Sequence, residues 1–351
     1  MNNMLYSEHE IVSCDRLLSE NAVRDNFGSS VAYIDNTMLQ WTEFFRVQNP
    51  KLKPNSIAFN FELNNFLSEN RLPTIGNWIF YPWINTVVRV LPKSEFRKVR
   101  YSRNKNKITD LEQSDLLNKS VGIIGLSVGQ TVGITMAMEG SFGKVKIADY
   151  DVLDLSNMNR LRAGIHQIGL PKTTLLARTI VEMDPYTEIE IFSEGISDHN
   201  LDFFLSGLDL LVEESDSFEI KIKSRKKARE KGIPVIMDTS DRGMLDIERF
   251  DLEPDRPLFH GRVKELESLD LSTIDPQVRM QILMQLVDYP NFSTRLKESY
   301  ALVGTELVTW PQLASDVMAG GGHAAEAARK ILLGMPMASG RYYVELDKVR
   351  D

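Results

Sequence analysis

Residues 121–133 have the sequence VGIIGLSVGQTVG, in which an apolar run breaks into a glycine-bearing turn. A buried strand that leads through such a turn into a helix is typical of the entry to a nucleotide site. The usual pattern G-x-G-x-x-G would need glycine at 125, 127 and 130, but the chain has Gly125, Ser127 and Gln130, with further glycines at 129 and 133. By itself, this turn fits tight packing as well as it fits a phosphate.

The segments around this turn alternate between apolar runs and helical patterns. The pattern predicts strands at SVGIIGL, KVKIADY, TEIEIFS, LDLLVEES and IPVIMDT, and helices near 129–140, 172–183, 199–206 and 218–231. Alternation of this kind predicts an α/β fold with a doubly wound, mostly parallel sheet of the Rossmann-like type. Helices near 275–288 and 312–333 and a last strand, RYYVELD, complete the domain that we expect over 99–351.

The first 98 residues differ from the rest of the chain in their pattern of predicted helices and strands. Helical patterns lie near 15–25 and 37–48, and GNWIFYPWINTVVRVLP (76–92) predicts short β segments around a turn at Pro82. We therefore expect an N-terminal α+β extension over 1–98. Its aromatic residues are expected in a core, because the 76–92 segment has few cations that would accompany base stacking.

Composition excludes several classes of protein. The chain of 351 residues has a net charge of −8, which argues against a general polyanion binder but leaves room for local basic patches. One cysteine, Cys14, excludes an internal disulfide framework and a cysteine-pair zinc site. No uncharged apolar run reaches the roughly 18 residues of a membrane helix and no leader pattern opens the chain, so we predict a cytoplasmic protein.

Polar residues follow the predicted strands. Asp149 ends the second strand, 24 residues after Gly125, where an acidic side chain can accept hydrogen bonds from ribose hydroxyls. Further charged and amide side chains follow it, namely Asp151, Asn157, Arg160, Lys172 and, after a later strand, Asp216. A dinucleotide has no need of two cations and another carboxylate, whereas ATP with Mg²⁺ does.

These motifs carry a resemblance to a known family. The D-x-D, SNMNR, GLPK and ESDS motifs, preceded by RYSRN at 100–104, resemble the ThiF/MoeB group of ubiquitin-activating-enzyme-like adenylyltransferases over roughly 99–335. GLSVGQ, EESDS, YPWINTVVRVLP and DTSDRGMLDIERFDLEPDRPLFHG resemble more closely a bacterial subgroup whose members are often fused to a nitroreductase domain. That domain would not fit in this chain, so we expect a stand-alone or truncated form.

The resemblance implies a role for each matched residue. Gly125, Ser127 and Gly129 would form the nucleotide turn together with Asp149 at the ribose and Asp151 beside it. Asn157, Arg160 and Lys172 would bind phosphates, Asp216 would hold Mg²⁺ beside the α-phosphate, and Arg103 would reach the triphosphate from the other subunit of a homodimer. A substrate carboxylate would then attack the α-phosphate and give an acyl-adenylate and pyrophosphate.

The chain also departs from the family pattern. It lacks the cysteine that accepts the acyl group in many members, and Cys14 lies far upstream in a predicted helix. The activated carboxylate is therefore expected to react directly, whether it belongs to a small molecule, a modified nucleoside or a peptide C-terminus. Two alternatives stay open, a nucleotide-binding module that regulates a flavin-dependent nitroreductase-like partner, and an NAD-dependent oxidoreductase.

Three other motifs have simpler interpretations. KIKSRKKAREK (221–231) is interpreted as the solvated face of a helix rather than a tRNA surface, because Ile222 and Ala228 provide an apolar side. We expect His260 to be a structural histidine with satisfied hydrogen bonds. The glycines of MAGGGHAAEAARKILLG (318–334) are expected to allow close helix packing, since no lysine stands where a phosphate loop needs one.

Overall fold

A computed structural model describes residues 8–17, 19–69, 75–263, 266 and 274–344. The chain forms two compact units, one of residues 1–110 with Asp184–Tyr186, and one of 111–183 with 187–351. The division lies after Asp110, whereas the sequence suggested a boundary after residue 98. We describe each unit by itself.

The first unit is a four-stranded sheet with helices. The sheet has the order β1-β3-β4-β2, in which β3 is antiparallel to β1 and β4 and only β2 runs parallel to its neighbour. The strands are β1 (Glu10–Ser13), β2 (Ala32–Asp35), β3 (Asn77–Tyr81) and β4 (Thr86–Val90), and the helices are α1 (Glu20–Phe27), α2 (Thr37–Gln48), α3 (Ile57–Glu69) and α4 (Lys93–Arg100). The predicted α+β character is confirmed.

Aromatic residues form the core of the first unit. Trp78 is 2% exposed and packs with Val23, Val31 and Val87. A second cluster joins Trp41 and Phe44 of α2 to Leu91. Cys14 is buried among the first of these clusters, in the turn after β1. The predicted helix at 15–25 is in fact α1, which begins at Glu20, so the expectation that Cys14 lies in a helix is wrong.

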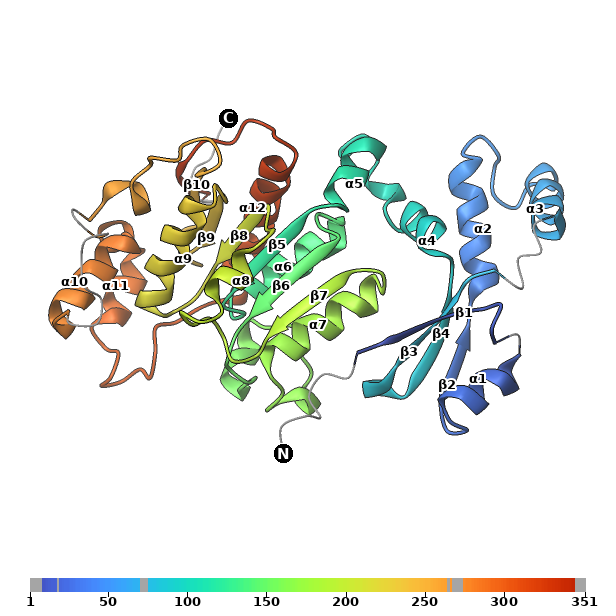
Figure 1. Cartoon of the computed structure of the whole chain (residues 1–351), viewed down its shortest axis with the longest axis horizontal. Helices are drawn as coiled ribbons and strands as arrows, with labels where there is room; N and C mark the ends of the chain where they lie inside the picture. Colours follow the sequence, from blue (N-terminus) through green and yellow to red (C-terminus); the bar gives the residue numbers. More distant parts are fainter. Residues whose placement is uncertain (1–7, 18, 70–74, 264–265, 267–273, 345–351) are drawn as a thin grey trace. The chain divides into compact units, whose positions relative to one another are not determined.

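The second unit is built on a seven-stranded sheet with the order β11-β10-β9-β8-β5-β6-β7 (Figure 1). The strands are β5 (Ser120–Ile124), β6 (Lys144–Ala148), β7 (Glu188–Phe192), β8 (Leu210–Glu213), β9 (Val235–Asp238), β10 (Met244–Glu248) and β11 (Gly340–Tyr343). The five strands from β9 to β7 are parallel. At the β9 edge, β10 pairs antiparallel with β9, and β11 pairs antiparallel with β10. The predicted doubly wound, mostly parallel sheet is confirmed.

Helices cover both faces of this sheet. The chain runs outward from β5 to β7 and then returns to β8 on the other side of β5, so right-handed crossovers place the helices before and after this return on opposite faces. Its long helices are α6 (Gly129–Glu139), α7 (Lys172–Met183), α9 (Phe218–Glu230), α10 (Pro276–Leu286) and α12 (Ala314–Leu332), and the shorter ones are α5 (Asp110–Leu116), α8 (Leu201–Leu205) and α11 (Thr294–Tyr300). α12 packs against α6, and α6 packs against α7.

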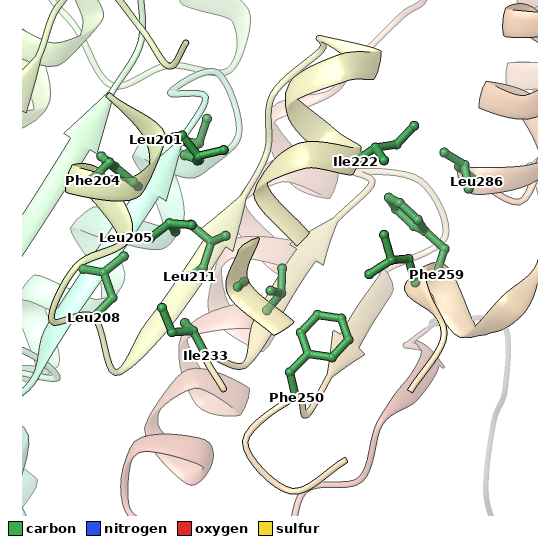
Figure 2. Close-up of a cluster of buried hydrophobic side chains, with 14 of the residues drawn as sticks. Leu201, Phe204, Leu205, Leu208, Leu211, Ile222, Ile233, Phe250, Phe259 and Leu286 are labelled. Atoms are coloured by element: carbon green, nitrogen blue, oxygen red, sulfur yellow. The ribbon is translucent and has the colours of Figure 1, made fainter. Parts of the chain in front are cut away.

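A large apolar cluster fills the face under α8 and α9. Phe204 and Leu205 of α8, Ile222 of α9, Leu286 of α10 and Phe259 all belong to this cluster, and Ile222 and Leu286 lie near Phe259 (Figure 2). Strand β5, buried along its whole length, lies near the middle of the sheet. The reversal of strand order falls between β5 and β8, which is where open α/β sheets bind ligands, beyond the carboxyl ends of the strands.

Candidate active site

The turn after β5 requires a glycine. Gly125 has φ +84°, and a Cβ there would lie 2.4 Å from the carbonyl oxygen of Glu214, which follows β8. The Gly125 amide donates to the carbonyl of Ala148 at 2.9 Å. The turn therefore lies directly against the ends of both neighbouring strands, where a side chain would push them apart.

The glycines at 129 and 133 explain the altered motif. They lie one turn apart on α6, and a Cβ on either would come within 2.9 Å of Ile123 of β5. They therefore allow the helix to pack closely on the strand, which is one of the functions of the usual motif. Gln130 is fully buried, and its side-chain oxygen accepts a hydrogen bond from the Arg162 amide at 3.0 Å. This contact ties the 160–162 segment to α6.

Asp149 connects the glycine turn to the loop after β6. Its two carboxylate oxygens accept hydrogen bonds from the backbone amides of Leu126 at 2.6 Å and Asp151 at 2.7 Å. Burial raises the pKa of the Asp149 carboxyl, although the two amides and Lys172 act in the opposite direction. Each oxygen keeps a second lone pair, so the bonds to the backbone leave room for a ribose hydroxyl.

Lys172 stands at the start of α7 with its ammonium group in the same pocket. Its Nζ lies 2.7 Å from Asp151 Oδ2, and the lysine side chain is 6% exposed whereas that of Asp151 is 51% exposed. The backbone amide of Lys172 also donates to the carbonyl of Asp151. Among the residues that the structure describes, Asp151 is the acid that pairs with this buried cation, and a half-exposed carboxylate can be exchanged for a phosphate while the lysine stays in place.

Arg160 approaches the turn from the other side. Its guanidinium donates to Ser127 Oγ at 3.1 and 3.3 Å and to Asn159 Oδ1 at 2.9 Å. Burial lowers the pKa of Arg160, and the negative charge of Asp216 opposes that shift. Asn157 turns back on its own loop, where its side-chain oxygen accepts a hydrogen bond from the Asp154 amide at 3.1 Å.

Six predicted residues line one pocket at the reversal of strand order, namely Gly125, Ser127, Asp149, Asp151, Lys172 and Asp216. Apolar contacts come from Ile124, Ile196 and Ile220, and Tyr150 lies at the same pocket with its ring against Gly195. Gly129, Asn157 and Arg160 belong to the surrounding elements. Arg103 lies in the first unit, in the short helix η3 (Ser102–Asn104).

Sequence reasoning missed the buried acids behind Asp216. Glu213 is fully buried, and its carboxylate accepts the Ser215 hydroxyl at 2.6 Å and Lys221 Nζ at 3.0 Å. Burial alone would raise the pKa of Glu213, but Lys221 and Arg225 lower it to about 2. The available signal was the pair of consecutive acids at the end of a fully apolar strand, because an acid on a strand buried along its length needs buried cations as partners.

A second acid pair spans the ends of β8 and β9. Glu214 Oε1 accepts the backbone amide of Asp238 at 2.7 Å. Burial raises the pKa of Asp238 to about 7, and burial together with the charge of Asp238 raises the pKa of Glu214. Asp238 packs on α12, where a Cβ at Gly320 would lie 2.0 Å from its carboxylate. The predicted close packing at the glycines of α12 is confirmed.

Two further predictions can be compared with the structure. His260 Nδ1 accepts a hydrogen bond from the Arg256 guanidinium at 2.8 Å, and His260 Nε2 donates one to the Asp246 carboxylate at 3.1 Å. The structural interpretation of His260 is therefore confirmed. On α9, Ile222 and Ala228 are buried while Lys223 and Lys227 pair with exposed acids, so part of the predicted solvated face is present. Lys221 and Arg225 depart from it, because both are buried in ion pairs with Glu213.

The donor set at the pocket fits a magnesium ion that arrives with a triphosphate. Among the residues that the structure describes, no group of three or more histidine, cysteine or acidic side chains could hold a metal. Mg²⁺ commonly takes one or two carboxylates and completes its octahedron with phosphate oxygens and water. Asp216, exposed at the pocket, provides one such carboxylate.

Known proteins resemble this chain in sequence and in fold. An uncharacterized protein, MT1398, of Mycobacterium tuberculosis (strain CDC 1551 / Oshkosh) is 41% identical over 274 residues; the match covers 78% of this chain and 38% of that protein. This chain thus spans about two fifths of the length of that relative. No described helix is long and apolar enough to cross a membrane.

Solved structures share the fold. E. coli tRNA N6-threonylcarbamoyladenosine dehydratase, TcdA, in complex with AMP gives a TM-score of 0.53 at 17% identity, over 70% of this chain and 98% of that one. E. coli MccB with AMPCPP and MccA gives 0.51 at 15% identity, over 89% and 86%. The ThiF family model matches residues 101–287. Because that match covers more than half of its length, this chain belongs to the ThiF family.

Proposed function

We propose that this protein is an ATP- and Mg²⁺-dependent adenylyltransferase that activates a carboxylate as an acyl-adenylate. The observation that carries the proposal is the meeting of Asp149, Lys172 and Asp216 with the glycine turn in one pocket. The glycine turn leaves space for the nucleotide, and Asp149 accepts hydrogen bonds from its ribose hydroxyls. Lys172 and Asp216 lie beside the position proposed for the phosphates. A site for a neutral ligand would not need this set of charges.

The charged residues have distinct roles in the proposed reaction. Lys172 exchanges Asp151 for phosphate oxygens, and Arg160 leaves Ser127 for the same group. Asn157 assists from the loop beside them. Asp216 would hold Mg²⁺, which supplies charge neutralisation at the α-phosphate when bound. The attacking carboxylate is already ionised, so positioning and neutralisation of charge provide the catalysis.

Arg103 is proposed to act across a homodimer. It belongs to the first unit, and its side chain is exposed. In the proposed dimer it would reach the triphosphate bound by a second copy of the chain, as an arginine supplied in trans does in other phosphoryl-transfer enzymes. The site would then be complete only in the assembled pair.

No thiol relay is part of the proposal. Cys14 is 2% exposed in the first unit, and burial raises the pKa of its thiol, so the reactive thiolate is disfavoured. The acyl-adenylate would instead react with a nucleophile that is already in place. In that step the nucleophile forms a bond to the acyl carbon while the bond to the AMP oxygen breaks.

The carboxylate is proposed to belong to one of three chemical classes, a small molecule, a modified nucleoside or a peptide C-terminus. TcdA is named for a modified nucleoside of tRNA, and the MccB structure contains MccA. The resemblance to the nitroreductase-fused subgroup adds a flavin-dependent nitroreductase-like protein as a proposed partner. A cytoplasmic location is proposed with it.

The proposal is tested by ATP–pyrophosphate exchange over a panel of carboxylates from the three classes. Exchange depends on a true substrate, on Mg²⁺ and on Lys172. Thermal stability with ATP and Mg²⁺, compared with NAD, is the companion measurement. A ligand at a hundredfold excess over its Kd stabilises the native protein by about 2.7 kcal/mol. A larger shift with NAD would favour an oxidoreductase, and an ATP shift without exchange on any carboxylate would favour a regulatory nucleotide-binding module.

A further inference from the structure

A basic segment of the first unit contributes at most one residue, Arg103, to the proposed reaction. Residues 93–107, KSEFRKVRYSRNKNK, contain seven lysines and arginines and one acid, in a chain whose net charge is −8. The segment comprises α4, η3 and the turn that follows to Lys107. Such a local excess of positive charge in an acidic protein attracts polyanions.

Most of these cations are not neutralised within the protein. Arg97 pairs with the buried Asp184 at 3.0 Å, and Lys105 lies 3.3 Å from Asp110 in a pair exposed on both sides. The remaining exposed cations make no ion pair with any described residue; they are Lys93, Lys98, Arg103 and Lys107. An exposed pair such as Lys105–Asp110 contributes little and is easily replaced by another anion.

Helix α9 shows that cation density alone does not create such a surface. The segment over 217–231 also has seven lysines and arginines, but five of them form ion pairs within the protein, namely Lys221, Lys223, Arg225, Lys227 and Lys231. Their field is cancelled at short range. The segment over 93–107 keeps its field, so the two segments differ in compensation rather than in composition.

The turn Arg103–Lys107 is an ordered platform of donors. All five of its side chains, Arg-Asn-Lys-Asn-Lys, are of types that can donate hydrogen bonds. Asn106 has φ +72°, and the amides of Lys107 and Ile108 both donate to the carbonyl of Asn104, at 3.0 and 2.9 Å. Because Tyr101 and Ile108 are buried on either side, the turn is anchored at both ends.

The chemistry of this surface selects a polynucleotide. One triphosphate in the proposed reaction already uses Arg160, Lys172 and at most Arg103, which leaves the lysines without an anion. A phosphodiester chain presents permanently ionised oxygens at regular spacing, and amide side chains among the cations can donate to sugar and base oxygens. An acidic peptide would match the positive charge, but it has no sugar or base oxygens to accept hydrogen bonds from the asparagine side chains.

We propose that the surface formed by Lys93, Lys98 and the turn Arg103–Lys107 binds the phosphate backbone of RNA. If so, the carboxylate activated by this protein is carried on a nucleoside of an RNA chain. That last step rests on the proposed function, whereas RNA binding itself does not. Electrostatic contacts of this kind weaken steeply with salt, because each neutralised phosphate releases counterions.

The test measures binding of unfractionated tRNA to the full-length protein by fluorescence anisotropy over a series of salt concentrations. The variant Lys98→Gln/Lys105→Gln/Lys107→Gln removes three charges and leaves Arg103 in place. We expect about tenfold or greater loss of affinity near 100 mM salt, and a log–log salt slope shallower by about 2–3. The matched control, Lys223→Gln/Lys227→Gln/Lys231→Gln on α9, removes the same charge and should leave both quantities near wild type.

Equal loss in the two variants, or wild-type binding to tRNA that does not depend on salt, would overturn the proposal. So would equal affinity for a poly-glutamate peptide, which would assign the surface to an acidic protein. Circular dichroism and thermal midpoints of both variants establish that they fold. Stabilisation by ATP and Mg²⁺ is measured on the same samples. If tRNA binding holds while ATP gives no shift in the wild type, the adenylyltransferase proposal fails and this one stands.

Discussion

Two charged clusters of the second unit each contain a buried cation but differ in the exposure of the acids that pair with it. Arg225 is fully buried between Glu213 and Glu248, with its guanidinium 4.2 Å from the centre of the Phe259 ring. In the pocket, the buried Lys172 pairs with Asp151, which is half exposed. The first cluster has its charges satisfied within the protein, and the second keeps them available to a ligand. Ion pairs between buried groups stabilise the fold, whereas a buried cation whose acid is exposed to water can bind a ligand in place of that acid.

The comparison is tested most severely at Arg225. Arg225→Met keeps most of the side-chain volume but removes the cation that pairs with the buried Glu248 and one of the two that pair with the buried Glu213, so the free energy of unfolding should fall by about 3–5 kcal/mol. Urea unfolding measures the change. Lys223→Met, two residues away on α9 and paired only at the surface, should cost no more than about 1 kcal/mol. Equal effects of the two substitutions would remove the distinction between the clusters.

The pocket should show the opposite behaviour. Lys172→Met removes a cation from the site of the phosphates, and we expect ATP–pyrophosphate exchange to fall by about a hundredfold to a thousandfold. Unfolding free energy should change far less than in Arg225→Met, because the abandoned Asp151 is half exposed to water. A variant that unfolds but keeps its activity per folded molecule would contradict the assignment of Lys172.

Asp238 provides a test through the pH dependence of stability, with an expected effect smaller than that of Arg225→Met. Its pKa is about 7 in the native protein and 3.8 in an ordinary setting, so the native state binds a proton that the unfolded chain lacks between those values. The stability that this proton contributes is complete below pH 4 and is lost as pH rises through 7. Between pH 5.5 and 7.5 the loss should be about 1–2 kcal/mol. Asp238→Asn, which stays neutral, should flatten that part of the stability curve, and an unchanged curve would place the titration elsewhere.

A smaller effect is expected from mixing inactive variants. Arg103→Ala and Lys172→Ala should each lack exchange activity, but a mixture that has exchanged subunits should recover about a quarter of wild-type sites. Half of the dimers would then be mixed, and each mixed dimer would have one intact site. Activity that stays absent, although mass spectrometry shows mixed dimers, would mean that both residues serve one site within one chain.

The smallest effect is predicted for the thiol. Cys14→Ser should leave exchange activity at the wild-type level, because the thiol is buried in the first unit whereas the pocket residues belong to the second. Any covalent acyl adduct on Cys14, detected by intact-mass analysis, would require a relay and would contradict the direct reaction.

Local patterns were sufficient for the sheet of the second unit. Its five parallel strands are short apolar runs, and Asp149 and Asp216 could be placed because each follows such a run directly. The acid pair Glu214–Asp238 could not be predicted, since it depends on which strand ends become neighbours. The first unit was harder to predict from the sequence, because β1, β2 and α3 lack a clear apolar period. β1 and β2 pair with β3 and β4, and side chains of these three elements pack against Trp78 and Trp41.

The two backbone hydrogen bonds of Asp149 have a consequence for mutational design. Asparagine is the usual isosteric replacement for aspartate, but it offers one oxygen and one amino group. Whichever way the amide is turned, the amide hydrogen of Leu126 or of Asp151 would face another hydrogen, so a donor would meet a donor. Asp149→Asn would therefore distort the turn itself, and Asp149→Ala, with space for water, is the gentler probe of contact with a ribose.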